Sequence, residues 1–540
     1  MKKTLLLLVF AATSLAVLAQ EKVKQLVTDD YDRNGLSVVV LNRGDKWDQY
    51  INEFITNLIV DEKFDVNDIA TKTINARVDR SEALTQGFVD TLLINSGISR
   101  EILGFVFNRK SDGSMDDALL RSRGLYNAKD QDILNASAAK VQEQYLEWGE
   151  KLLNGGYIAL LDVSNLKENV TQKKDGSTSV NYDADVKAYV YKLACDRAKL
   201  DDFYSVAWAD ATSSAAAKAA ARKAFDQFEM GYFPVATVSG SNSSTSSMLS
   251  SVKSIIASGS NPDTTPLGAI QLAYNNVMSK LENTIPAWQV AVSIVETHPL
   301  RAKIGMKEGL KNGQRFRAYS YAEDKDGNLV SEKRGYLRAT KVFDNRSVAT
   351  GSTEPSEFYQ ISGVANIQEG WTIKQKNDLR LGVGLSPGLG LSAFQINLDL
   401  DYLVRISQMG SIYALVSLGT DPTACDFSNG VFDIIFGVGA GYGLHLTRMF
   451  ELAPYAKVGV DALAVSDDTP GYYKGSGTSA FFVEPGARFS VNFYPLSVYL
   501  KVYYDYLMGA NSGFYGVWNN SSKMNHASGI GAGLGVKWTF

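Results

Sequence analysis

The chain ends on the sequence IGAGLGVKWTF, residues Ile530–Phe540, in which apolar residues alternate with small or polar ones. Side chains along a β-strand point alternately to the two faces of its sheet. One face of this stretch is therefore apolar and consists of Ile530, Ala532, Leu534, Val536, Trp538 and Phe540. The other face consists of glycines followed by Lys537 and Thr539. This pattern predicts a strand with one face toward lipid and the other toward a crowded interior.

The same alternation recurs through the residues that precede this strand. It is strong at Phe394–Ile406, Phe432–Leu446 and Val498–Met508, where we expect the apolar set to face lipid. Weaker versions lie at Leu379–Leu385, Ile412–Leu418, Ala456–Ala464 and Phe481–Phe493. Together these stretches predict an antiparallel transmembrane β-barrel of about eight strands, at the small end of the size range of such barrels.

The links between the predicted strands alternate in length. Short links lie at Ser407–Ser411, Thr447–Glu451 and Tyr494–Ser497. Longer links, rich in polar residues and glycine, lie at Thr420–Gly430, Ser466–Thr478 and Gly509–Asn525. Short turns at one end and longer loops at the other are typical of transmembrane barrels.

A C-terminal strand that carries Trp538 and ends on Phe540 resembles the last strand of Gram-negative outer-membrane β-barrel proteins. The resemblance implies that Trp538 and Phe540 form an assembly signal, read by the outer-membrane assembly machinery. It also implies a barrel over residues 376–540 surrounded by outer-membrane lipid, with its short turns in the periplasm. The large region before the barrel is then expected to be periplasmic.

The inward positions of the predicted strands carry charges of both signs. The bases are Arg380, Arg405, Lys457, Arg488, Lys501 and Lys537, and the acids are Asp399, Asp401, Asp433, Asp461, Glu484 and Asp505. A narrow barrel leaves room only for side chains, and a buried charge without a partner costs several kcal/mol or more. We therefore expect a network of paired charges in the lumen and a barrel closed to ions and small solutes.

The chain begins with Met1-Lys2-Lys3 and an apolar run from Leu5 to Ala19, which predicts a secretory signal peptide over residues 1–19. Two cysteines follow, Cys195 in the expected periplasmic part and Cys425 in an expected outer loop. They lie on opposite sides of the membrane in this interpretation, so we do not expect them to pair.

Residues 20–154 and 155–285 predict two α+β domains. The first contains an apolar strand at Leu36–Leu41 and amphipathic helices at Asp45–Val60 and Asp130–Leu153. The second contains expected strands at Tyr157–Val163 and Val180–Leu193, and expected helices at Ala207–Phe228 and Gly268–Leu281. A serine-rich stretch, residues 239–260, predicts a loop inside the second domain.

Residues 286–375 predict a small all-β domain. Its expected strands are Gln289–Val295, Gln314–Ala322 and Arg334–Val342, and Asp326-Gly327 predicts a hairpin turn between the last two. The run Gly309–Phe316 resembles the loop-then-strand entry of SH3-like barrels in secreted assembly proteins. That resemblance implies an SH3-like fold for this domain.

Few residues suggest chemistry. The three histidines are scattered over separate regions, so we expect no metal site, and no motif predicts a cofactor. The net charge of −4 gives no case for nucleic acid binding. His526 and Ser528 resemble the His-x-Ser pair of an eight-stranded outer-membrane lipid A deacylase family, but no Asp or Glu follows Ser528 to orient the histidine.

These observations favour a structural or scaffolding outer-membrane protein. In this interpretation the barrel anchors the chain, and the periplasmic region binds a periplasmic protein or a cell-wall partner. Two alternatives stay open. One is an outer-membrane lipid-modifying hydrolase that uses His526 and Ser528, and the other is a transport or secretion accessory protein.

Overall fold

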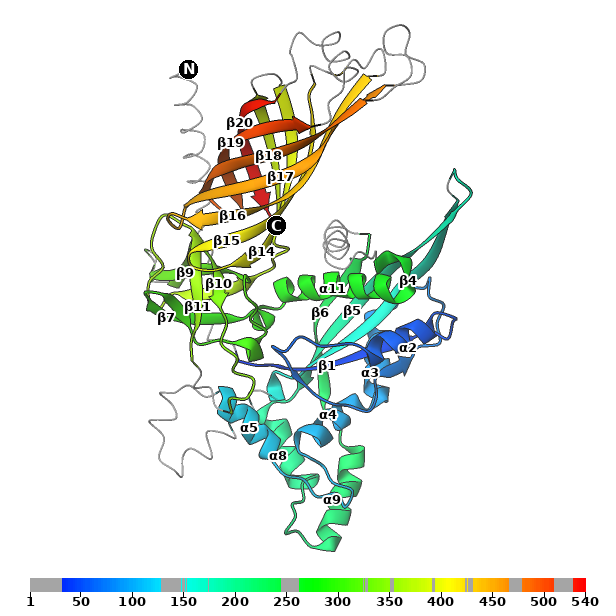
Figure 1. The fold of residues 1–540 in the computed structure, drawn as a ribbon. Helices are drawn as coiled ribbons and strands as arrows, with labels where there is room; N and C mark the ends of the chain where they lie inside the picture. Colours follow the sequence, from blue (N-terminus) through cyan, green and yellow to red (C-terminus); the bar gives the residue numbers. More distant parts are fainter. Residues whose placement is uncertain are drawn as a thin grey trace.

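The computed structural model describes residues 32–127, 147, 151, 153–172, 174–243, 262–323, 325, 329–349, 354–390, 394–422, 425, 431–465, 478–508 and 528–540. The predicted signal peptide, most of the predicted helix Asp130–Leu153, the Asp326-Gly327 turn and most of the serine-rich stretch lie outside these residues. The described chain forms an N-terminal domain with a mixed sheet, a small β-barrel and a C-terminal β-barrel (Figure 1). The small barrel lies between the other two parts.

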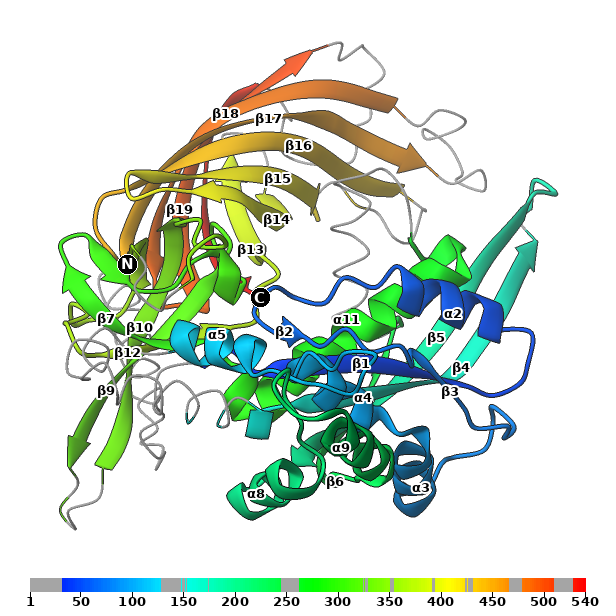
Figure 2. The same ribbon diagram turned by 90° about the horizontal axis from the view of Figure 1, so that it is seen from below.

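The N-terminal domain is built on one sheet. Its strands are β1 (Gly35–Asn42), β2 (Asp65–Val66), β3 (Thr73–Asn75), β4 (Tyr157–Gln172), β5 (Thr178–Ala194) and β6 (Gly231–Ser241). They follow the order β2-β1-β4-β5-β6, and β3 also pairs with β1. β1 runs parallel to β2, β3 and β4, whereas β4, β5 and β6 are antiparallel. The β4–β5 hairpin extends well beyond the sheet (Figures 1 and 2).

Helices cover both faces of this sheet. One face packs against α2 (Asp48–Thr56) and α11 (Pro266–Thr284). The other face packs against α3 (Gln86–Ser96), α4 (Ile98–Val106), α5 (Ala118–Asn127), α8 (Arg197–Val206) and α9 (Ala215–Gln227). Among the described helices, none is long and apolar enough to cross a membrane.

The sequence of β1 explains its central position. Leu36, Val38 and Val40 enter the core beneath α2 and α11, while Val39 and Leu41 enter the core on the opposite face. A strand covered on both faces needs a continuous apolar run, which β1 has, and not an alternating one. The predicted strand Leu36–Leu41 is therefore confirmed.

The predicted boundary between residues 154 and 155 falls inside this domain. Strand β1 pairs with β4, with Leu36 opposite Tyr157, so the two stretches share one sheet and one pair of cores. Strand β6 also continues through Ser241, into the stretch expected to be a serine-rich loop. Pairing between strands that are far apart in the chain leaves no local periodic signal, and this is why the sequence suggested two domains.

The small barrel consists of β7 (Ala291–Thr297), β8 (Leu300–Ala302), β9 (Arg315–Glu323), β10 (Leu329–Lys341), β11 (Ser356–Ser362) and β12 (Thr372–Lys376). It closes in the order β10-β11-β8-β7-β12-β9 around a core that includes Phe316, Leu337, Phe358 and Ile373. Of the 3-10 helices described, η1 (Pro262–Thr264) precedes α11 in the N-terminal domain, η2 (Pro286–Trp288) precedes β7, and η3 (Met306–Glu308) lies between β8 and β9. The all-β expectation for this segment is confirmed, whereas the SH3-like detail stays a prediction.

The C-terminal barrel closes with eight antiparallel strands, as the sequence predicted. They are β13 (Leu381–Gly390), β14 (Phe394–Ile406), β15 (Gly410–Thr420), β16 (Val431–His445), β17 (Phe450–Val465), β18 (Thr478–Asn492), β19 (Leu496–Met508) and β20 (Gly529–Thr539). Each strand pairs with the next, and β20 pairs with β13 to close the cylinder.

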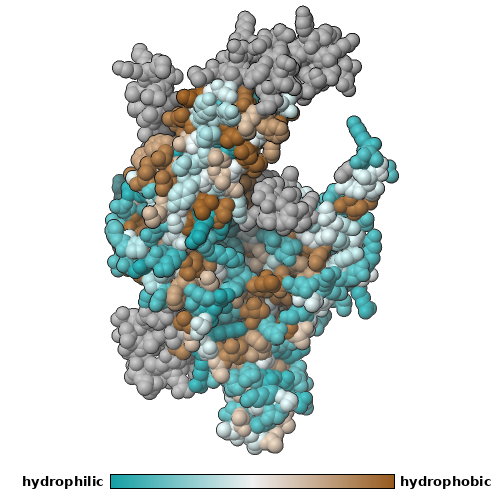
Figure 3. Space-filling model, viewed as in Figure 1, coloured by the Kyte–Doolittle hydropathy of each residue, from teal (hydrophilic) through white to brown (hydrophobic). Residues whose placement is uncertain are grey.

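The outer surface of this barrel is apolar. Phe436, Leu500 and Val536 are each about half exposed although they sit in the middle of strands. Figure 3 shows hydrophobic residues on the C-terminal barrel, whereas the β4–β5 hairpin tip is hydrophilic. A closed barrel with an apolar outside and a polar inside is the β-structure that a bilayer accepts, because every strand edge is paired.

One strand departs from the predicted alternation. A register shift between Leu403 and Arg405 places an extra residue, Val404, in β14. Beyond this bulge the faces are exchanged. Leu403 and Ile406 are buried in the barrel, and Arg405 is exposed. The predictions that Arg405 faces inward and Ile406 faces lipid are therefore wrong.

Two glycines of β20, Gly535 and Gly531, lie opposite tyrosines of the neighbouring strand β19. A Cβ atom on Gly535 would lie 2.3 Å from Cζ of Tyr499, and one on Gly531 would lie 2.3 Å from Cζ of Tyr503. Tyr499 is 1% exposed and Tyr503 is 3% exposed. The glycine face of the last strand thus makes room for two tyrosine rings that fill the interior.

We expect Gly535→Val to destabilise the barrel by about 1–3 kcal/mol, because the added side chain overpacks a filled interior. Displacing Tyr499 would also break the hydrogen bond from its hydroxyl to Asp399 (2.8 Å). The matched control is Ala532→Val on the outward face of the same strand. The measurement is urea unfolding of the full chain in detergent, and equal midpoints for the two variants would contradict this packing.

Candidate functional site

The lumen of the C-terminal barrel holds ion pairs both across its interior and between neighbouring strands. Asp401 of β14 accepts from Arg488 of β18 at 2.8 Å and from Lys537 of β20 at 3.0 Å. Lys457 of β17 lies 3.0 Å from Glu484 of β18. These side chains are all less than a tenth exposed. The pair of Arg488 and Asp401 joins opposite walls of the barrel, whereas the pair of Lys457 and Glu484 joins two neighbouring strands.

Hydroxyl groups complete the polar contacts of the carboxylates. Asp399 accepts from the hydroxyls of Tyr499 and Ser386, both at 2.8 Å, and lies 3.7 Å from Nζ of Lys501. Glu484 accepts from the hydroxyl of Tyr455 at 2.7 Å. The cavity left among these residues measures about 10 Å³. That volume is too small for a continuous column of water.

The structure places most of the predicted lumen charges inside. Nine are buried in the barrel: Asp399, Asp401, Asp433, Lys457, Asp461, Glu484, Arg488, Lys501 and Lys537. Asp505 is half-buried near the end of β19 that lies far from the small barrel. Arg405 is exposed on the outside, and Arg380 lies at the mouth, where its guanidinium donates to the Asn312 carbonyl of the small barrel.

Tyr455 and Glu451 are lumen residues that were not among the predicted ones. Tyr455 donates to Glu484, and Glu451 accepts from the Tyr413 hydroxyl at 3.0 Å. Both belong to β17, which begins at Phe450 although the sequence suggested a start at Ala456. Pro454 reads as a strand boundary, since proline has no N–H for a sheet ladder. Extending the alternation back from Lys457 would have placed both residues inside.

The small barrel covers the end of the C-terminal barrel at which the short turns lie (Figure 1). Each of the three short turns contacts it. Gln408 donates to Glu357 at 3.2 Å, Nε of Arg448 donates to the Gly363 carbonyl at 2.9 Å, and Tyr494 accepts from Arg338 at 3.1 Å. Tyr359 also stacks on His445, with ring centroids 4.4 Å apart. The small barrel therefore acts as a cap on this mouth.

A buried ion pair lies at the centre of this junction. Arg338 of the cap pairs with Asp378, the residue that leads into β13, and both side chains are about 5% exposed or less. Burial disfavours the charge on Arg338, but the neighbouring carboxylate outweighs it and raises the pKa of the guanidinium. The cavity that remains at this mouth is about 60 Å³, enough for a few water molecules.

The cap is also joined to the N-terminal domain. Asn345 of the cap donates to the Tyr126 hydroxyl at 3.1 Å, and Asn34 donates to the Ala287 carbonyl at 2.9 Å. The rings of Phe64 and Trp288 meet edge to face with centroids 4.9 Å apart. Burial, and then the nearby Glu308 carboxylate, raise the pKa of Tyr126 above its ordinary value.

A groove of about 790 Å³ lies between the N-terminal domain and the cap. Its apolar lining comes from both sides and includes Ile59, Val60, Tyr274, Met278, Met306, Leu310 and Val342. Ile59 is 89% exposed, which is unusual for an isoleucine. Charged residues stand at its rim, with Glu62 on the N-terminal side 3.9 Å from Arg346 on the cap. We call this cavity the junction groove.

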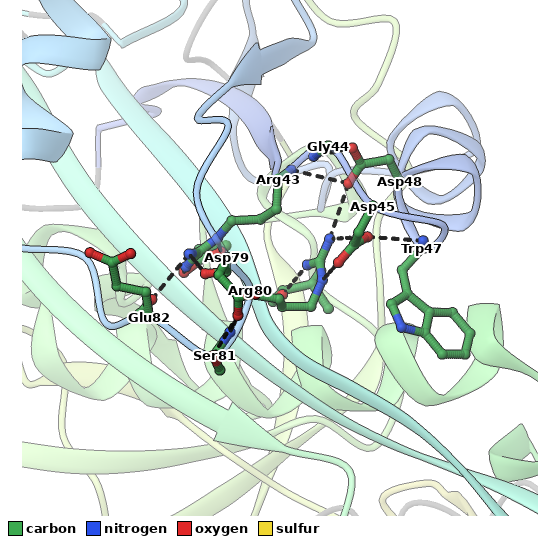
Figure 4. Close-up of polar contacts among 11 residues, drawn as sticks. Arg43, Gly44, Asp45, Trp47, Asp48, Asp79, Arg80, Ser81 and Glu82 are labelled. Atoms are coloured by element: carbon green, nitrogen blue, oxygen red, sulfur yellow. Dashed lines mark hydrogen bonds and ion pairs between the residues drawn. The ribbon is translucent and has the colours of Figure 1, made fainter.

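The densest charge cluster of the N-terminal domain follows β1 (Figure 4). The Arg43 guanidinium pairs with buried Asp162 at 2.7 Å and donates to the Asp79 and Glu82 carbonyls at 2.8 and 3.0 Å. Arg80 pairs with Asp45 and Asp48. These contacts bind the loop after β1 to β4 and to the loop before α3. Because both arginines are held in these ion pairs and hydrogen bonds, we assign the cluster a structural role in fixing the two loops.

The residues proposed for hydrolysis are not brought together by the described structure. His526 lies outside the described residues. Ser528 is exposed, and its hydroxyl oxygen accepts from the Leu507 amide at 2.9 Å. The hydrolase and the transport alternatives therefore stay predictions without a supporting contact.

The predicted assembly-signal residues end the last strand at the capped mouth. Trp538 is 48% exposed and Phe540 is 39% exposed, both on the outer surface. The Phe540 amide donates to the Leu381 carbonyl, and the Phe540 carbonyl accepts from the Leu379 amide. Phe540 thereby closes the seam between the first and last strands.

No family model matches the sequence, and no curated protein is significantly similar to it. Several solved structures are similar to part of the chain. The N-terminal β-barrel domain of Pseudomonas aeruginosa OprF is 14% identical, with a TM-score of 0.21, and the alignment covers 30% of this chain and 96% of that one. A major outer membrane protein from Thermus thermophilus is also 14% identical, with a TM-score of 0.21, over 30% of this chain and 98% of that one.

Ail, the attachment invasion locus protein of Yersinia pestis, is 14% identical, with a TM-score of 0.19, over 30% of this chain and 95% of that one. The strand pairing of this chain, and not these similarities, establishes its fold. The chain carries a closed eight-stranded barrel of the kind found in small outer-membrane proteins, preceded by a large region of mixed α/β and β structure.

We expect Asp401→Ala to destabilise the barrel by roughly 3–5 kcal/mol, because it leaves two buried cations without their carboxylate. Arg488→Ala should cost less, since Asp401 keeps its contact with Lys537. Arg405→Ala on the same strand as Asp401 is the control, and an exposed position should change stability by less than about 0.5 kcal/mol. Urea unfolding of the full chain in detergent measures all three. Equal losses for Asp401→Ala and Arg405→Ala would contradict the lumen network.

Proposed function

We propose that this protein is an outer-membrane protein whose barrel is a closed anchor and whose N-terminal region is a periplasmic binding module with a scaffolding role. The observation that carries the proposal is the sealed barrel. Its lumen is filled by paired charges and tyrosine rings, and its capped mouth holds a cavity of about 60 Å³. A barrel without a path for solutes serves as a membrane anchor for the N-terminal region attached to it.

The periplasmic placement rests on the two ends of the barrel. Three short turns and both barrel termini lie at the capped end, on the same side as the N-terminal region (Figure 1). In outer-membrane barrels the short turns face the periplasm. The N-terminal region would then stand just beneath the membrane, joined to the barrel through the cap.

The junction groove is the site that we assign to a periplasmic partner. It is mostly apolar, its volume falls in the range of ligand sites, and it lies at a domain interface, where such sites are frequent. An exposed isoleucine at its edge and opposite charges on its two rims suit a protein segment that inserts an apolar side chain. A scaffolding role follows if that segment belongs to another envelope protein.

We expect the purified full chain to give no steady conductance in a planar lipid bilayer, because charged and aromatic side chains fill the lumen. An open porin reconstituted in the same bilayer is the control for insertion. Reproducible channels of porin size would overturn the anchor function.

We expect Ile59→Glu to reduce recovery of the periplasmic partner in a crosslinking pull-down from intact cells. Loss of an apolar side chain that anchors an interface typically weakens it by about tenfold or more. Ile94→Glu is the matched control, since Ile94 is 52% exposed on α3, on the other face of the sheet. Equal recovery with both variants would exclude the junction groove as the binding site.

A further inference from the structure

Basic side chains gather on two neighbouring strands of the cap. Arg315 and Arg317 of β9 lie directly opposite Lys376 and Lys374 of β12 in the antiparallel register. Phe316 and Ile373, which alternate with them, point into the cap core. Like charges placed opposite each other on neighbouring strands are destabilising. We call Arg315, Arg317, Lys374 and Lys376 the basic patch.

No acid compensates this patch in the described structure. Within the part of the chain that the structure covers, no carboxylate forms an ion pair with its four members, and Asp378, the next acid along the chain, is held by Arg338. Lys374 is only 5% exposed. Burial, and then repulsion from Arg317, Lys374, Lys333 and Arg315, lowers the pKa of Lys376 to about 8.

Aromatic rings fix the orientation of these cations. The Arg317 guanidinium lies 4.5 Å from the centroid of Tyr336, and Nζ of Lys374 lies 5.7 Å from that of Tyr319. The Arg315 guanidinium lies 5.1 Å from the ring of Tyr494 and donates to its hydroxyl. The cations are thereby held in place on the strands although they repel one another. Such an arrangement is expected where an anion binds.

The patch lies close to the membrane boundary. Tyr494 belongs to the short turn between β18 and β19, at the capped end of the barrel. Even a fully extended chain from Lys376 to Leu381, the first residue of β13, spans at most about 17 Å. Headgroups of the adjacent leaflet occupy the zone just outside the hydrocarbon core. The patch therefore stands where lipid phosphates are found.

We propose that the basic patch binds the phosphate headgroups of anionic phospholipids in the leaflet beside the capped end of the barrel. The proposal rests on the membrane-anchored barrel of the proposed function. Bound headgroups would supply the negative charge that the described residues do not provide at this position. They would also hold the cap, and with it the N-terminal region, against the membrane surface.

The test uses the full chain in detergent, titrated with dioleoylphosphatidylglycerol or with dioleoylphosphatidylcholine, with bound lipid counted by native mass spectrometry. We expect the wild-type chain to prefer the anionic lipid. The variant Arg317→Gln/Lys376→Gln should lose about 25-fold in affinity for it, at roughly fivefold for each cation near a membrane surface. Lys167→Gln/Lys174→Gln, on the β4–β5 hairpin, removes the same charge far from the mouth and should bind like wild type.

Three outcomes would overturn the proposal. The first is equal binding of the two lipids, and the second is an equal loss of affinity in the two double variants. The third is binding of inorganic phosphate as tight as that of phosphatidylglycerol, because this result would assign the patch to a free anion. Insertion into lipid vesicles is scored separately by protease resistance of the barrel. A chain that inserts but does not prefer the anionic lipid refutes only the lipid site, whereas a chain that fails to insert refutes the proposed function.

Discussion

An eight-stranded barrel has so little space inside that an inward charge is costly unless an opposite charge lies within side-chain reach. Asp401 satisfies this requirement for two cations at once, and Glu484 does so for Lys457. Tyrosine hydroxyls supply further hydrogen bonds, and glycines on the facing strands leave room for the rings. The paired charges and the tyrosine rings thus leave a cavity of only about 10 Å³ among them.

Closure at the capped mouth has a different physical origin. There the small barrel meets all three short turns, and the buried pair of Arg338 and Asp378 joins it to the first transmembrane strand. Breaking a buried pair by removing one partner is costly, so this contact fixes the cap to the barrel. The cap in turn contacts the N-terminal domain through Asn345, which donates to the Tyr126 hydroxyl. The orientation of the whole N-terminal region therefore follows from a short junction.

The junction groove and the basic patch both belong to this junction. The groove lies where the cap meets the N-terminal domain, and the patch lies on β9 and β12 of the cap, beside Tyr494 of the barrel. A partner in the groove and lipid on the patch would contact the same small barrel from two sides. The cap is thus the part through which an event at the membrane surface could change the N-terminal domain.

The sequence by itself determined the features that depend on local alternation. The eight strands, the lipid-facing apolar sets and nine of the buried lumen charges follow from a period of two residues. The bulge at Val404 did not follow, because one inserted residue exchanges the faces without altering composition. Tyr455 and Glu451 were missed because Pro454 reads as the end of a strand.

Only the tertiary structure decided the contacts between distant parts of the chain. Strand β1 pairs with β4 and so unites two stretches that look separate, and the cap docks on the short turns through Arg338, Gln408 and Arg448. The patch is likewise invisible in sequence, since Arg317 and Lys374 come together only through the register of β9 and β12. Periodicity reports which way a side chain points, whereas its partner depends on packing between elements that the chain brings together from far apart.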